Sequence, residues 1–99
     1  MKDPADISSM KDLRVEIDAL DRELVALLAD RTRLIDRAAE LKPAEGLPAR
    51  IDARVEDVVV KVKAEAEIRG LAPELAEVLW REMMEHFIAR EERVLGKGH

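Results

Sequence analysis

The chain contains no cysteine and no tyrosine, and its only aromatic residues are Trp80 and Phe87. Without cysteine, neither disulfide bonds nor thiolate catalysis is available to the protein. With so few aromatic side chains, the chain also lacks a platform on which nucleic-acid bases stack. The formal net charge of -5 points the same way, and we expect no nucleic-acid partner.

Long apolar runs are also missing. No stretch of roughly 18 consecutive apolar residues, the length that a membrane span requires, occurs in the chain. The N-terminal residues MKDPADISSM lack the apolar core of a signal peptide. We therefore predict no membrane partner and a cytoplasmic location. Neither histidine has a metal-ligating neighbour at a usual spacing, so we expect no metal site.

Proline and glycine are scarce, and both are absent from residues 11–42. In this stretch apolar residues recur at alternating steps of three and four, which predicts one long amphipathic helix. The apolar seam consists of Leu13, Ile17, Leu20, Leu24, Leu27, Leu34, Ala38 and Leu41. Such a helix is roughly 46 Å long, whereas a compact globule of this size has a radius of gyration of ~13 Å. The seam would be exposed in a single copy, so we predict an intertwined homodimer.

The rest of the chain predicts two further helices and no sheet. Prolines and a glycine between residues 43 and 48 indicate a loop. A second helix is expected from near Arg50 or Asp52 to about Arg69, with Gly70 as its stop. A third helix begins at Pro73 and runs to about residue 95. We therefore predict an all-α fold with three helices per protomer, in a single domain of residues 1–99 whose first ten residues form an arm.

Arg31 interrupts the apolar seam of the long helix. A buried guanidinium requires either an internal acid or an anionic ligand. Lys42 follows eleven residues later, about 20° from eclipsed and about 16 Å along the axis, so both cations face the same side. Arg14 precedes Arg31 by about 25 Å of helix and lies on a different face. Arg14 is therefore predicted to join this pocket only from the partner copy of an antiparallel dimer.

Two residues of the other helices extend this cationic set. Arg54 follows the proline-containing loop, which can bring it near Lys42. Glu91 stands where the third helix needs an apolar residue, and a carboxyl in apolar surroundings resists ionisation and can donate a hydrogen bond. The stripe in question is Met84, Ile88, Glu91 and Leu95.

Each of these residues also has a purely structural interpretation. Arg31 can form a buried ion pair with Glu91 or another acid, and Lys42 can complement the C-terminal end of the helix dipole. Arg14 and Arg54 can be ordinary surface residues, and Glu91 can lie at the rim of the core. Under this interpretation the protein is a helical dimerisation module without catalytic activity.

The spaced residues of the long helix and the next helix form one pattern. It consists of Leu13-Arg14, Ile17-Asp18, the run LLADR ending at Arg31, then Lys42, and then Arg54 after the loop. This pattern resembles the all-helical class of chorismate mutases over about residues 10–95. The resemblance implies a three-helix protomer in an intertwined dimer, in which the partner's long helix completes each of two pockets with one arginine.

The resemblance also implies a role for each matching residue. Arg31 and the partner's Arg14 look like bidentate clamps for two substrate carboxylates. Lys42 resembles the cation that contacts a carboxylate and the ether oxygen of the breaking bond, and Arg54 resembles a further cation of the pocket. Glu91 falls where bacterial members commonly have glutamine, the second donor to the ether oxygen.

The chemistry of this family suits such a site. The pericyclic rearrangement of chorismate to prephenate needs no nucleophile, metal or cofactor. It needs a dianion held in a compact conformation and positive groups where charge develops on the ether oxygen. We therefore predict chorismate mutase activity, in aromatic amino-acid biosynthesis, with no cofactor.

Three residues depart from the family pattern. Glu91 can donate to the ether oxygen only when protonated, so activity should fall as the pH rises. Val55 stands where many of these mutases carry a glutamate that contacts the ring hydroxyl, and Phe87 replaces a small polar residue. The changes at Val55 and Phe87 resemble the related isochorismate-pyruvate lyases, and isochorismate-pyruvate lyase is therefore the alternative activity. Asp52 is a candidate to replace the missing hydroxyl contact.

Overall fold

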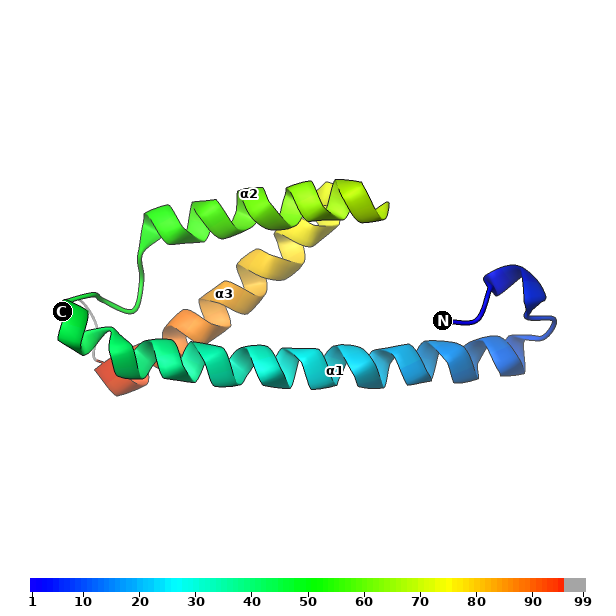
Figure 1. Cartoon of the computed structure of the whole chain (residues 1–99), viewed down its shortest axis with the longest axis horizontal. Helices are drawn as coiled ribbons and strands as arrows, with labels where there is room; N and C mark the ends of the chain where they lie inside the picture. Colours follow the sequence, from blue (N-terminus) through cyan, green and yellow to red (C-terminus); the bar gives the residue numbers. More distant parts are fainter. Residues whose placement is uncertain (96–99) are drawn as a thin grey trace. The chain divides into compact units, whose positions relative to one another are not determined.

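The computed structural model describes residues 1–95, and every regular element in this part of the chain is helical (Figure 1). Two short 3-10 helices, η1 (Pro4–Asp6) and η2 (Pro43–Glu45), accompany three α-helices. The α-helices are α1 (Met10–Leu41), α2 (Asp52–Arg69) and α3 (Pro73–Leu95). The predicted all-α fold with a long first helix is therefore confirmed, and its helix bounds agree to within a residue or two.

A side-chain cap defines the start of α1, and a glycine defines the end of α2. Ser9 Oγ accepts a hydrogen bond of 3.1 Å from the backbone N–H of Asp12, which caps the start of α1. Gly70 adopts the left-handed conformation with φ of 76°, a conformation that glycine adopts without a Cβ penalty. The N–H of Leu71 then donates to the carbonyl of Ala66 at 2.9 Å. This hydrogen bond is the six-to-one bond of a Schellman end.

The chain divides into two units, and the first comprises Met1–Leu34. It contains η1 and most of α1, and none of its residues is buried. The apolar seam is widely exposed, with Leu24 at 52%, Leu27 at 65% and Leu34 at 72% of their full accessible surface. A row of leucines exposed to this degree on one helix is typical of a surface that another chain covers.

The second unit begins at Ile35 and contains the end of α1, η2, α2 and α3. Helices α2 and α3 pack against each other. The core of this unit consists of Ala39, Ala49, Val59, Ala66, Ala76, Met84 and Ile88. Helix α2 contributes Val59 and Ala66 to this core.

The apolar face of α3 is wider than its single neighbour can cover. Leu75, Val78 and Leu79 are apolar residues of this helix, yet all three are exposed. Ala76, Met84 and Ile88 are buried instead. A helix that packs mainly on one side buries only one stripe, so in this unit Leu75, Val78 and Leu79 stay exposed.

Ion pairs connect α3 to α2 and to the loop that precedes α2. Arg81 donates two hydrogen bonds of 2.9 Å to Glu56 and one of 2.8 Å to Glu77. These hydrogen bonds hold the pKa of both carboxyls below its ordinary value. Arg50 likewise forms a bidentate pair with Glu85 and lowers the pKa of that carboxyl.

These lowered pKa values predict that the protein loses stability in acid. A carboxyl whose folded-state pKa is depressed stabilises the fold above its unfolded pKa, and that contribution disappears as the pH falls through the folded pKa. The midpoint of thermal unfolding should therefore decrease between roughly pH 5 and pH 3. Arg81→Gln should flatten this decrease, because Arg81 causes the largest shift at both Glu56 and Glu77. A midpoint that is level over this pH range would contradict the prediction.

Candidate functional site

Lys42 and Glu91 form a buried ion pair in the second unit. Lys42 follows the end of α1 and begins η2, and Glu91 lies on α3. Lys42 Nζ donates to Glu91 Oε2 at 2.6 Å and to the carbonyl of Ala49 at 2.8 Å. Only 15% of the lysine side chain and 6% of the glutamate side chain are exposed. The ammonium group thus links the end of α1 to the loop before α2 and to α3.

The position of Glu91 agrees with the apolar stripe from which it was selected. Met84 and Ile88 on the same stripe are buried, and so is Glu91, so the interpretation of Glu91 as a rim residue is wrong. Lys42 does more than complement the helix dipole, because it carries a specific partner. Glu91 Oε2 accepts this hydrogen bond, and the role of Glu91 as a donor to the substrate stays a prediction.

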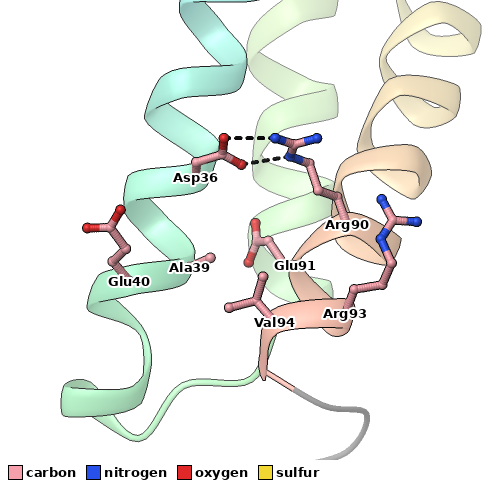
Figure 2. Close-up of a pocket in the computed structure, with 7 residues that line it drawn as sticks. All are labelled: Asp36, Ala39, Glu40, Arg90, Glu91, Arg93 and Val94. Carbon is pink, nitrogen blue, oxygen red and sulfur yellow. Dashed lines mark hydrogen bonds and ion pairs between the residues drawn. The ribbon is translucent and has the colours of Figure 1, made fainter.

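A second ion pair connects the same two helices beside the first. Arg90 Nε donates to Asp36 Oδ1 at 2.7 Å, and Arg90 Nη2 donates to Asp36 Oδ2 at 3.0 Å (Figure 2). The pair lowers the pKa of Asp36 and raises the pKa of Arg90, chiefly through these hydrogen bonds. Sequence reasoning missed both residues, because neither departs from the charged pattern of an exposed helix face.

A cavity of about 410 Å³ opens beside the two ion pairs. Its lining residues are Asp36, Ala39, Glu40, Arg90, Glu91, Arg93 and Val94 (Figure 2). Glu40 has its own partner in Arg37, at 2.7 Å. The cavity therefore combines acidic and basic side chains with the small apolar residues Ala39 and Val94, and it reaches the buried Glu91.

Among the remaining predicted residues of the second unit, Arg54 has an ion-pair partner of its own. Arg54 donates to Asp57 at 2.6 Å with 62% of its side chain exposed, and within residues 1–95 it makes no ion pair or hydrogen bond with Lys42. An exposed guanidinium takes the carboxylate three residues away on its own helix. Asp52 is exposed and Val55 is partly buried. Phe87 is partly buried and meets the ring of His86 edge to face at 5.1 Å.

Arg14 and Arg31 belong to the first unit. Both lie on α1 as predicted, Arg14 exposed and Arg31 partly buried. Their roles as carboxylate clamps stay predictions.

Two features of the described residues concern metal binding and membrane insertion. Over residues 1–95, His, Cys, Asp and Glu side chains do not gather in a group of three or more that could hold a metal ion. None of the helices in the same part of the chain combines the length and the apolar character that crossing a membrane requires.

Comparison with known proteins places the chain among relatives of known type. The family model for chorismate mutase type II matches residues 13–92. The chain is 36% identical over 85 residues to the T-protein of Haemophilus influenzae, covering 86% of the chain and 22% of that protein. It is 33% identical over 88 residues to the T-protein of Enterobacter agglomerans, covering 88% of the chain and 24% of that protein.

The name of a third relative includes chorismate mutase. The bifunctional chorismate mutase/prephenate dehydratase of Aquifex aeolicus is 30% identical over 91 residues, covering 89% of the chain and 25% of that protein. The chain thus spans about a quarter of the length of the curated relatives it matches.

Proposed function

The chain belongs to the chorismate mutase type II family, and we propose that it catalyses the rearrangement of chorismate to prephenate. The observation that carries this proposal is the largely buried ammonium of Lys42, 2.6 Å from Glu91 and 2.8 Å from the carbonyl of Ala49. A preorganised cation in a water-poor site stabilises charge that develops in a transition state far better than one in water. The pericyclic step needs such a cation and needs no nucleophile.

The proposed roles of the side chains follow the family resemblance. Lys42 donates to the ether oxygen of the breaking bond, and Glu91 contacts the same oxygen as a protonated donor. Arg31 holds one carboxylate of the substrate, and the partner's Arg14 holds the other. The rest of the pocket is proposed to be lined by Arg54, Asp52, Val55 and Phe87.

The ion pair adds a step to substrate binding. The ammonium of Lys42 has three N–H donors, two of which bond to Glu91 and Ala49, so the substrate can accept from the third or take the place of Glu91. If Lys42 leaves Glu91, the carboxylate becomes a buried charge beside a dianion, and such a charge is strongly disfavoured. Uptake of a proton by Glu91 removes this charge and creates the second donor. We therefore propose that substrate binding and protonation of Glu91 are coupled.

The active form is proposed to be an intertwined homodimer. The exposed leucines of the first unit, among them Leu24, Leu27 and Leu34, support this proposal, because a second copy would remove them from water. The exposed Leu75, Val78 and Leu79 of α3 are further apolar surface for a partner to cover. Each pocket would then contain Arg31 from one copy and Arg14 from the other.

Mixing two inactive variants tests this shared pocket. Arg14→Ala and Arg31→Ala should each abolish most of the turnover when assayed alone. When the two are unfolded together and refolded as a mixture, half of the dimers are hybrids, and one pocket of each hybrid has both arginines. Activity should return to about a quarter of the wild-type value. Full turnover in both single variants would favour the helical dimerisation module, in which these arginines are only structural.

The activity itself is tested with chorismate and the purified chain in the presence of EDTA. Prephenate should form in proportion to the amount of protein, since the proposed reaction uses only side chains of the protein. Complete loss of turnover on adding EDTA, restored by a metal ion, would contradict the proposed mechanism.

A further inference from the structure

We propose that Asp36 and Arg90 are a positioning pair that sets the geometry between Lys42 and Glu91. This inference rests on the proposed function, since it concerns residues that act on the reaction through Lys42. Neither Asp36 nor Arg90 is expected to touch the substrate. Their task is to fix where α3 stands relative to the last turns of α1.

The two ion pairs lie close to each other along the chain. Arg90 directly precedes Glu91 on α3, and Asp36 lies six residues before Lys42 along the end of α1. Arg90 donates two hydrogen bonds to Asp36, of 2.7 and 3.0 Å. A planar guanidinium bound by two parallel hydrogen bonds fixes orientation as well as distance. The pair therefore restrains the backbone that carries Glu91 against the backbone that leads to Lys42.

Apolar packing supplies less of this restraint than it does between α2 and α3. The buried apolar residues of α3 accompany its packing against α2, whereas α1 buries only Ala39 in its whole length. The polar contacts between this end of the chain's first helix and α3 include the Asp36–Arg90 pair and, from the residue after α1, the Lys42–Glu91 pair. Without a large apolar interface, the placement of Lys42 relative to Glu91 depends on polar contacts that can be lost one at a time.

Stability alone does not account for the Asp36–Arg90 pair. Its side chains are 43% and 45% exposed, and an ion pair exposed to this extent contributes little to folding. A proposed catalytic contact, by contrast, tolerates displacement by only a fraction of an ångström. The half-exposed Asp36–Arg90 pair therefore serves to position the buried Lys42–Glu91 pair.

Asp36→Asn and Arg90→Met are the test variants, and Glu40→Gln is the matched control. Glu40 lies on the same stretch of α1, lines the same cavity and forms an exposed ion pair, but its partner Arg37 is on its own helix. Asp36→Asn should lower kcat for chorismate by about tenfold with little change in KM. Glu40→Gln should leave kcat unchanged, and the midpoint of thermal unfolding should move little in either variant.

The double variant Asp36→Asn with Arg90→Met separates a pair from two independent residues. If the residues act as one device, the double variant should lose about tenfold in kcat, as each single variant does, and not about a hundredfold. An effect of local charge alone would instead lower KM in both Asp36→Asn and Glu40→Gln, since each removes a negative charge near a dianion.

The outcomes distinguish this inference from the proposed function. If the wild-type protein forms prephenate and Asp36→Asn keeps the wild-type kcat, the positioning role is wrong while the activity stands. An equal fall in kcat for Glu40→Gln would also overturn it. If the wild-type protein itself forms no prephenate, the proposed function has failed.

Discussion

Lys42→Met should reduce kcat/KM for chorismate by about 10³-fold, which is the largest effect expected for any single substitution in the chain. The variant keeps the apolar stem of the side chain and removes the ammonium that donates to Glu91 and Ala49. Steady-state turnover of chorismate measures the loss.

A second variant separates catalysis from folding. Lys42→Met leaves Glu91 without its cation in a site where 6% of that side chain is exposed, and removing one partner of a buried pair costs about 3–5 kcal/mol. Combining Lys42→Met with Glu91→Gln removes the orphaned charge. The double variant should recover much of the free energy of unfolding while remaining inactive. Recovery of turnover along with stability would show that Lys42 only supports the fold.

Glu91→Gln should change the pH dependence of the reaction, which is the second large effect. In the wild-type protein, kcat/KM should fall with rising pH by up to about tenfold per unit, because one proton must be bound for Glu91 to act as a donor. Glutamine donates at every pH, so the variant should keep its activity in the alkaline range. The measurement is a profile of kcat/KM from roughly pH 5 to pH 9.

The charged groups around Glu91 define the control for this profile. Lys42 bonds to its carboxylate, and Asp36, Glu40, Arg90 and Arg93 line the cavity beside it. Glu40→Gln alters one of these carboxyls without altering Glu91, and it should retain the wild-type profile. If Glu91→Gln and the wild-type protein show the same slope, the fall in activity originates elsewhere and the proposed protonation step is wrong.

Local patterns were sufficient to predict the helices. The spacing of leucines in α1, the prolines at residues 43 and 73, and Gly70 each act through backbone chemistry within a few residues. Glu91 was found in the same way, since an acid at an apolar position of a helical stripe is visible without any tertiary structure. These features depend only on neighbours along the chain.

The partners of the charged residues could not be predicted in this way. Lys42 and Glu91 were both selected as site residues, yet nothing in the sequence distinguished Lys42 from Arg31 as the cation beside Glu91. Their contact depends on how the loop returns the chain to α3. Asp36 and Arg90 gave no signal at all, because a bidentate pair is made by two helices whose register is a tertiary property.

Arg54 and the outer face of α3 illustrate a different limit. The guanidinium of Arg54 was expected near Lys42, but in the structure it pairs with Asp57, a local alternative that any exposed helix offers. Leu75, Val78 and Leu79 are apolar, but one protomer leaves them exposed. A sequence records that a residue is apolar, and it does not record which chain covers it.

The product formed from each of two enolpyruvyl ethers tests the central claim most directly. The purified chain is incubated separately with chorismate and with isochorismate, and prephenate, salicylate and pyruvate are quantified after chromatography. The account predicts prephenate from chorismate at a rate that Lys42→Met abolishes, and no salicylate or pyruvate from isochorismate above the uncatalysed rate. Salicylate and pyruvate from isochorismate, with no prephenate from chorismate, would contradict it and assign the chain to the lyases.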